Sequence, residues 1–212
     1  MNFKKQIVFP HYFVNYAIFI VELIMMNKKN IISISGDLAS GKGTVSEILM
    51  KKLGHGIYKN GDYFRKLAKE HNMTLQEFGE YVSTHPEIDI EIEESAKKYA
   101  LNHDNFIIDA RLGWYAVPES FKVYLKVDIN EAAKRAFNDL KRKDLENFIS
   151  VEEHKKALEE RYKKENERYF SLYNVRKEDM SNYDLVIDTT EKTPLEVANI
   201  IIAEYEKWKK IS

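Results

Sequence analysis

The fold of this chain is decided by the stretch Gly36-Asp37-Leu38-Ala39-Ser40-Gly41-Lys42-Gly43-Thr44. An apolar, β-branched run precedes it at residues 31–35, and a pattern typical of a helix follows it at 45–53. A strand, a glycine-bounded loop with a lysine and a helix make a phosphate-binding unit. Glycines let backbone N–H groups turn toward an anion, and the helix directs the positive end of its dipole to the same place. The stretch therefore predicts a nucleoside triphosphate site, with Lys42 reaching the outer phosphates.

The residue after the lysine departs from the common pattern. A glycine-rich turn that only joins a strand to a helix is the alternative, but such a turn does not need a lysine there. The common pattern has Ser or Thr directly after the lysine, where its hydroxyl binds Mg²⁺. In this chain Gly43 takes that place and Thr44 follows it. We therefore expect phosphates, waters and an acidic residue elsewhere to hold the metal more than the loop does.

The composition favours one sizeable α/β domain. The chain has 212 residues, and 33 basic and 34 acidic side chains give a net charge of -1. No global field attracts nucleic acid, so an anion site must come from local placement of charge. Cysteine is absent, which excludes disulfides and thiolate chemistry and fits a reducing cytoplasm.

The first segment of the chain does not match the rest. Residues 12–26 are apolar except for one amide and one carboxylate. A membrane span needs about 20 apolar residues, and a signal peptide needs a small-residue cleavage site. The segment is either an anchor or extra helix, or the result of a start assigned too early. We favour the second explanation, that the start was assigned too early. Residues 1–25 are then an extension, Met25 or Met26 is the true start, and the domain covers 26–212.

The remaining pattern predicts a doubly wound, parallel, five-stranded α/β sheet, with ligands at the carboxyl edge of the strands. The expected strands are 31–35, 57–59, 106–110, 121–127 and 184–188, and the expected helices are 42–53, 62–71, 74–83, 88–101, 130–143, 151–173 and 194–209. Thr74, with Glu77 three residues on, predicts a capping box. The regions 61–104 and 140–175 have no strand, so we expect helical insertions placed as lids over that edge.

A basic residue in the first turn of an expected helix points to an anion. Asp62 is expected to cap the helix that follows Gly61, and Arg65 lies in its first turn. A positive charge there opposes the helix dipole at a cost of about 0.3–1 kcal/mol. A solvated arginine could tolerate that cost. The phosphate loop upstream instead favours an anion bound by Arg65 and the free N–H groups of the helix.

Asp109 and Arg111 end a buried strand at the edge where the phosphate loop lies. Asp109 could hold Mg²⁺, directly or through water, and Arg111 could bind a second phosphate with both arms of its guanidinium. An ordinary ion pair at the strand end is the alternative.

Two further arginines lie in the helical pattern at 151–173. Arg161 and Arg168 are seven residues apart, so they share one face, beside an aromatic stripe. Neighbouring Glu and Lys residues in the i,i+4 order explain much of the remaining charge as helix support. We interpret the two arginines as phosphate clamps, and Arg135 and Arg142 as weaker candidates.

Together these pieces resemble a cytidylate kinase of the short, archaeal-like subgroup of P-loop nucleoside monophosphate kinases. The GKGT ending of the loop is similar to that of nucleoside monophosphate kinases. The other matching stretches are GDYFRKLA at 61–68, HPEID at 85–89, DARLGW at 109–114, Arg168-Tyr169 with Tyr173, and YDLVIDT at 183–189. The family has DPEID and EGRLAGW at two of these places, so Asp109-Ala110 replaces Glu-Gly. A basic residue is also expected where Ile90 stands, and an arginine where Asn138 stands.

The resemblance implies the P-loop kinase fold and transfer of the γ-phosphoryl group of ATP to CMP or dCMP. It implies ATP at loop residues 36–44, Mg²⁺ near Thr44 and Asp109, an acceptor site in the insertion at 61–104 and a lid at 140–175. The expected acceptor-binding residues are Gly61, Asp62, Arg65 and Arg111, and the expected catalytic residues are Lys42, Asp109, Arg161 and Arg168. The attacking phosphate oxygen is anionic, so no strong general base is required.

Two alternatives stay open at this point. The departures from the family pattern could mark an ATP-binding regulator without useful transfer. The acceptor could also be AMP, UMP or an alcohol, and an alcohol would need Asp109 or Asp62 as a base. We expect a cytoplasmic monomer that acts on small-molecule nucleotides and binds no nucleic acid, with membrane contact only if the N-terminal extension is native.

Overall fold

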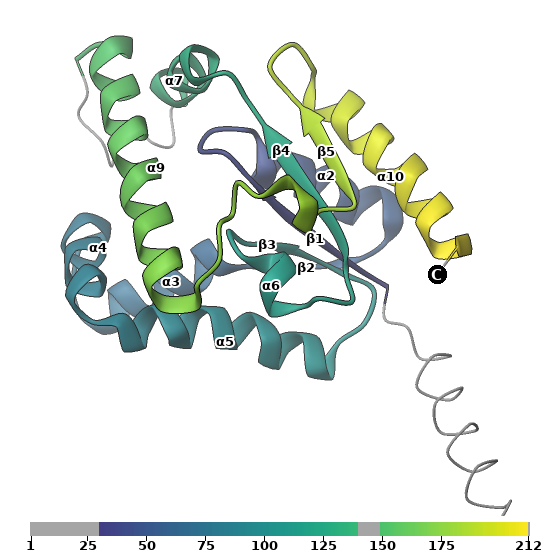
Figure 1. The fold of residues 1–212 in the computed structure, drawn as a ribbon, viewed down its shortest axis with the longest axis horizontal. Helices are drawn as coiled ribbons and strands as arrows, with labels where there is room; N and C mark the ends of the chain where they lie inside the picture. The colour runs from purple at the N-terminus through teal and green to yellow at the C-terminus, as the bar shows by residue number, and fades with distance from the viewer. Residues whose placement is uncertain (1–29, 140–148, 212) are drawn as a thin grey trace, which may run out of the picture.

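The computed structural model describes residues 30–139 and 149–211 (Figure 1). The expectations for the extension at 1–25 and for a start at Met25 or Met26 lie outside the described residues. So do Arg142 and the part of the expected lid at 140–148.

The core of the molecule is a single parallel sheet. Its strands are β1 (Ile31–Gly36), β2 (Gly56–Lys59), β3 (Phe106–Asp109), β4 (Phe121–Lys126) and β5 (Leu185–Asp188). Their order in the sheet is β2-β3-β1-β4-β5, and every neighbouring pair is parallel. All residues of β1 are buried, as expected for a central strand with helices on both faces. The predicted doubly wound sheet is therefore confirmed.

Helices cover both faces of the sheet. On one face, α2 (Lys42–Leu53) and α10 (Pro194–Ile211) pack over side chains of β1 such as Ile32 and Ile34. On the other face, α5 (Pro86–Asn102) and α6 (Gly113–Ala116) enclose Ile31 and Phe106. Side chains of alternate residues along the strands thus pack into two separate cores, because successive side chains of a strand point to opposite faces of the sheet.

The first insertion lies between β2 and β3. It consists of α3 (Asn60–Glu70), α4 (Leu75–Thr84) and α5, which share a small apolar cluster around Phe78. The predicted capping box of α4 is confirmed, because the Thr74 hydroxyl accepts from the Glu77 N–H and the Glu77 carboxylate accepts from the Thr74 N–H.

The predicted start of α3 was wrong. The helix begins at Asn60, with Lys59 at its N-cap, so Asp62 lies inside the first turn and is not the N-cap. Arg65, which was predicted to lie in the first turn, lies in the second. The cause is the direct passage from β2 into α3, which leaves no loop in which Asp62 could act as a cap.

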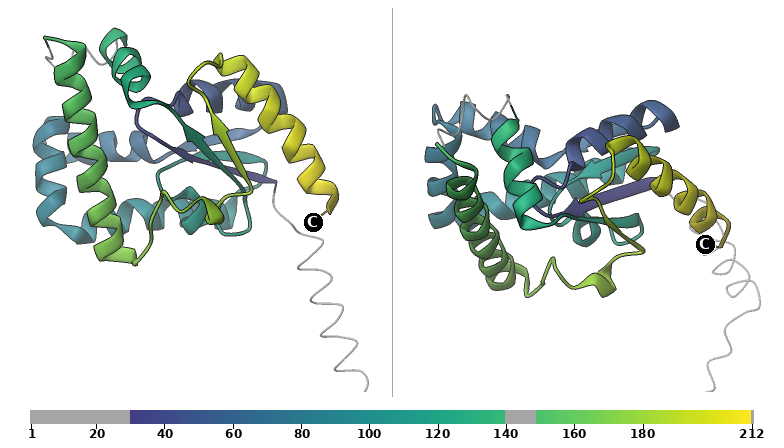
Figure 2. Two further views of the ribbon diagram at one scale, coloured as in Figure 1. Left: turned by 45° about the horizontal axis from the view of Figure 1, so that its top comes forward. Right: turned by 90° about the horizontal axis from the view of Figure 1, so that it is seen from above.

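The second insertion lies between β4 and β5. It contains α7 (Ile129–Asn138) and the long helix α9 (Val151–Tyr173), which pack on each other, and a single 3₁₀ turn, η1 (Met180–Asn182), follows. In all three views α9 lies on the same side of the molecule as α3 and α4, opposite α10 (Figures 1 and 2). The insertions therefore face each other across the carboxyl edge of the sheet. Within 30–139 and 149–211, no helix is both long and apolar enough to cross a membrane.

Candidate active site

The phosphate loop depends on glycine at two positions. Gly36 has a φ of 149°, and a Cβ there would lie 2.4 Å from the carbonyl oxygen of Leu125 on β4. Gly41 has a φ of 88° in the left-handed region and stands at the N-cap of α2, with no side chain to cap that helix. The first N–H groups of a helix lack intrahelical partners. The loop therefore presents open donors at the positive end of α2.

Lys42 is held inside this loop. Its Nζ donates to the carbonyl oxygens of Gly36 at 3.0 Å and Asp37 at 2.9 Å. Burial lowers the pKa of Lys42 well below its usual range, the nearby Arg111 lowers it further, and Asp109 partly offsets both. The amine is thus positioned by backbone and stands among other charges before any ligand arrives.

A large cleft opens at the carboxyl edge of the sheet, with a volume of about 1970 Å³. Its walls come from the phosphate loop, both insertions, the end of β3 and the segment after β5. The residues predicted from the sequence that line it are Ala39, Ser40, Gly41, Lys42, Gly43, Thr44, Gly61, Arg65, Asp109, Arg111, Arg135, Arg161 and Arg168. Asp62 is the one predicted acceptor residue that does not line it.

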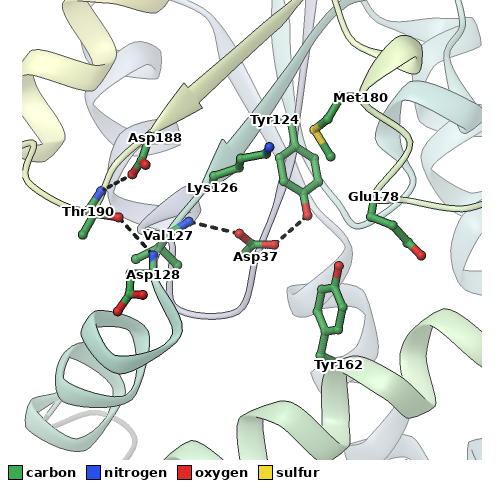
Figure 3. Close-up of a pocket in the computed structure, with 10 residues that line it drawn as sticks. All are labelled: Asp37, Tyr124, Lys126, Val127, Asp128, Tyr162, Glu178, Met180, Asp188 and Thr190. Atoms are coloured by element: carbon green, nitrogen blue, oxygen red, sulfur yellow. Dashed lines mark hydrogen bonds between the residues drawn. The ribbon is translucent and has the colours of Figure 1, made fainter.

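The predicted ATP loop divides into two parts. Residues 39–44 line the cleft, whereas Gly36, Asp37 and Leu38 do not. The Asp37 carboxylate points to a smaller cavity of about 470 Å³ on the other side of the loop (Figure 3). There it accepts from the Tyr124 hydroxyl at 2.6 Å and from the Val127 N–H at 3.0 Å (Figure 3). Asp37 therefore supports the loop from the side away from the cleft, and its carboxylate already accepts two hydrogen bonds.

Asp109 stands beside the start of α2. A Cβ on Gly43 would lie 3.7 Å from Asp109 Oδ2, so the two residues are in contact range. Burial raises the pKa of Asp109, and Lys42 and Arg111 partly offset that effect. Thr44 is exposed in the same wall. No group of three or more His, Cys, Asp or Glu side chains suited to a metal occurs among the described residues.

Two arginines of the cleft meet at a carboxylate that the sequence did not reveal. Glu165 on α9 is buried, and it accepts from Arg111 Nε at 3.1 Å and Arg161 Nε at 3.2 Å. Lys177 Nζ also donates to it, at 3.0 Å. Burial alone would raise the pKa of Glu165, but these three cations outweigh it and hold the pKa well below its usual range. The strand-end ion pair considered for Arg111 thus has a partner 54 residues away.

Lys177 is the other residue that sequence reasoning missed at this point. It follows α9, is 1% exposed, and its Nζ lies 4.3 Å from the ring centroid of Tyr162. Burial lowers its pKa, and Glu165 offsets part of that shift. A lone lysine between two helical patterns carries no sequence signal for burial, so only the folded chain reveals it.

The remaining cations have partners of their own. Arg168 Nε lies 2.6 Å from Oδ2 of the buried Asp89 on α5. Arg65 pairs with Asp62 on the exposed side of α3. Arg135 donates to the carbonyl oxygens of Thr189 and Thr190, at 2.7 and 2.9 Å, and so holds the segment after β5.

A polar group of a different kind lines the cleft between α3, α5 and α9. Asn60, Asp89 and Glu93 are all buried there, and none was predicted. A signal was present: the two acids are four residues apart, and each directly follows an isoleucine of the buried face of α5. Acids at that spacing beside an apolar stripe indicate carboxylates turned toward the interior.

Comparisons with known proteins agree with this geometry. The cytidylate kinase-like family model matches residues 31–191. The chain is 34% identical over 184 residues to a protein named cytidylate kinase from Thermoplasma volcanium, covering 84% of this chain and 93% of that protein. It is 40% identical over 174 residues to one from Thermococcus kodakarensis, covering 82% of this chain and 86% of that protein. Among solved structures, shikimate kinase from Acinetobacter baumannii, in complex with shikimate, superposes with a TM-score of 0.55 at 15% identity, over 85% of this chain and 95% of that one. That last likeness is one of fold alone.

Proposed function

The chain belongs to the cytidylate kinase-like family, and on that premise we propose that it transfers the γ-phosphoryl group of ATP to CMP or dCMP. The products are ADP and the pyrimidine nucleoside diphosphate. One observation carries the proposal: Lys42 lines the same cleft as arginines from four other parts of the chain. Phosphoryl transfer needs two aligned phosphates and positive charge around the group in flight, and this convergence supplies both.

The donor site is the phosphate loop. The open N–H groups at the start of α2 would bind the phosphates of ATP, as helix N-termini bind anions in general. Lys42 would exchange its contacts with the loop carbonyls for contacts with the outer phosphates. Arg135 and the segment it holds after β5 border the same part of the cleft as residues 39–44.

The acceptor site lies at the other end of the cleft. Arg65 and Arg111 would bind the phosphate of CMP, since both line the cleft and neither is committed to the phosphate loop. Arg65 is exposed and pairs with Asp62 of its own helix, so its charge can be redirected at low cost. Arg111 would use the part of its guanidinium that Glu165 does not occupy.

The helix α9 contributes the charges that would close the site. Arg161 and Arg168 would lie over the transferred group, so we propose that α9 and its surroundings act as the lid and α3–α5 as the acceptor-binding insertion. Enclosure by these side chains would also keep out water that could otherwise hydrolyse ATP. The acceptor oxygen is already anionic, so the chain needs no strong base for this step.

We propose that Asp109 and Thr44 hold the Mg²⁺ that accompanies ATP, directly or through water. Mg²⁺ is usually bound by one or two carboxylates together with phosphates and waters, and this donor set fits that habit. Gly43 brings the loop backbone into contact range of Asp109, so the carboxylate borders the phosphate site. When bound, the ion neutralises charge on the phosphates.

The alternatives differ in what they require of the chain. An ATP-binding regulator would bind nucleotide without turnover, and the named relatives do not favour it. A kinase for an alcohol would need a base, and of the two candidates only Asp109 lines the cleft. Monomeric state and a cytoplasmic location stay predictions; light scattering and cell fractionation would test them.

A coupled ADP-release assay with ATP, Mg²⁺ and a panel of acceptors tests the proposal. The panel is CMP, dCMP, UMP, AMP and shikimate. We expect CMP and dCMP to give the highest kcat/KM. Calorimetric binding of ATP without turnover on any acceptor would instead support the regulator, and turnover only on shikimate would support the alcohol kinase.

A further inference from the structure

A pair of buried carboxylates lines the cleft where α3, α5 and α9 meet. Asp89 and Glu93 lie four residues apart on α5, so they share one face of the helix, and both line the cleft. They are 6% and 7% exposed, and Asn60, at the start of α3, is 9% exposed beside them. Carboxyl oxygens accept hydrogen bonds, so this part of the cleft suits a ligand group that donates them.

The walls around these polar groups are apolar. Phe64 of α3, Val82 of α4 and Ile92 of α5 line the same cleft. A slot with apolar walls and a few convergent polar groups is the usual form of a site for a small, flat ligand. The position fits the acceptor's base, because Arg65 and Arg111 line the same cleft and would hold its phosphate.

The polar groups of this slot still have bonding capacity. Within the described parts of the chain, Glu93 Oε2 and both polar atoms of the Asn60 side chain are buried without a hydrogen bond of good geometry, although Asn60 and Glu93 interact with each other. Buried polar atoms nearly always have a partner, so such atoms need an explanation. One such explanation is a ligand that supplies the missing partners, and it can apply here because these residues line a cleft.

The charge state of the slot is set by its neighbours. Burial, and after it the Asp89 carboxylate, raises the pKa of Glu93 to about 7, and Asn60, Arg168 and Arg111 offset part of the shift. The other titratable groups that interact with Glu93 are Tyr58, Tyr169 and Tyr173. Near neutral pH a protonated Glu93 carboxyl can donate one hydrogen bond and accept another.

We infer that Glu93, with Asp89 beside it, binds the base edge that carries an amino group next to a ring nitrogen, and thereby selects cytosine over uracil. The inference rests on the proposed function. Cytosine presents its N4 amino group beside the acceptor N3, so Glu93 can donate to N3 and accept from N4. Asp89 is one helical turn away and ion-paired with Arg168, so it adds a negative charge near the amino group. Uracil has a carbonyl oxygen in place of the amino group and an N–H in place of the acceptor N3. A neutral Glu93 carboxyl could turn over to pair with both, but the carbonyl oxygen would then lie near the negative charge of Asp89, which favours an amino group at that place.

Three variants test the inference with CMP and UMP as acceptors at saturating ATP. Glu93→Leu removes both the donor and the acceptor. Glu93→Gln keeps one donor and one acceptor at the same place. Glu94→Gln, on the exposed side of the same helix, is the matched control, since Glu94 is exposed and forms a surface ion pair with Lys97.

For Glu93→Leu we expect the ratio of kcat/KM for CMP to that for UMP to fall about 10- to 100-fold, the range of a good bidentate contact to a base. Glu93→Gln should keep that ratio within about fivefold of the wild type, and Glu94→Gln within about twofold, on the same grounds. KM for ATP should stay unchanged in all three. A Glu93→Leu enzyme that folds and still prefers CMP as the wild type does would overturn the inference.

Failure of the proposed function would look different, because the wild type itself would then turn over neither CMP nor UMP. In that case calorimetric titration with CMP and UMP reads the slot directly. Loss of CMP binding in Glu93→Leu, but not in Glu94→Gln, would still support the inference, and equal binding in both would overturn it. Should Glu93→Leu not fold, Glu93→Met offers a flexible apolar side chain of similar length for the same two measurements.

Discussion

The two ends of the cleft are built by different means. At the donor end the backbone shapes the site, since Gly41 opens the start of α2 and two loop carbonyls hold Lys42. At the acceptor end, ion pairs between distant segments shape it, as between Arg111 and Glu165. The donor end is therefore formed before a ligand arrives, whereas the acceptor end must exchange internal pairs for ligand contacts. Substitutions at the donor end should change the reaction rate, and substitutions at the acceptor end should also change stability or specificity.

The largest effect on activity is expected for Lys42→Met at the donor end. It removes the cation of the donor end and leaves the glycine-shaped backbone intact, so we expect kcat to fall about 10³-fold or more, the scale for losing one preorganised charge. The melting temperature should not fall, because a buried charge is replaced by an apolar side chain of similar length. Steady-state kinetics and thermal denaturation measure the two effects. A large loss of stability would show that Lys42 also holds the loop together.

At the acceptor end, Glu165→Gln should act mainly on stability. The buried Lys177, the partly buried Arg111 and the exposed Arg161 would lose the charge of their common partner, at a cost of about 3 kcal/mol. Urea denaturation of the variant measures it. Glu204→Gln, which disrupts a surface pair with Lys207, is the control and should cost less than about 1 kcal/mol. Equal costs in the two variants would contradict the central role of Glu165.

The pH dependence of stability tests the acidic slot. The pKa of Glu93 is raised from about 4.5 to about 7 in the folded chain, so the folded state binds the proton more tightly. The stability that this proton adds is complete below pH 4.5 and is lost as pH rises through 7. Relative to Glu93→Gln, the wild type should lose about 3 kcal/mol of unfolding free energy between these pH values. If the unfolding free energies of the wild type and Glu93→Gln changed with pH in parallel, Glu93 would ionise in the folded state without a loss of stability.

The smallest effect is expected for Arg65→Ala. Arg65 is exposed and paired within its own helix, so its removal should leave stability unchanged within about 0.5 kcal/mol. The apparent KM for CMP should rise about 10- to 30-fold, since one charge-assisted contact to phosphate is lost. Lys66→Ala, its exposed neighbour on α3, is the control. Unchanged kinetic constants for Arg65→Ala would remove it from the acceptor site.

Sequence patterns predicted the elements closely where they are long. The expected helices at 42–53 and 151–173 coincide with α2 and α9, because periodicity over many residues and a glycine or a serine at the start act locally. The short elements α6 and η1 were not predicted, since three or four residues carry no measurable period. The start of α3 was misplaced because a strand that runs directly into a helix leaves no cap signal.

The linear order of residues was sufficient for the phosphate loop, the parallel sheet and the helices beside it. These depend on neighbours in the chain: glycine torsions, alternation of apolar side chains and the dipole of the helix that follows. The folded chain was needed to bring Glu165 between Arg111 and Lys177, and to bury Asp89 and Glu93. The reason is physical: the charge and protonation of a buried group depend on which distant side chains surround it, and that proximity exists only after the insertions have packed over the sheet.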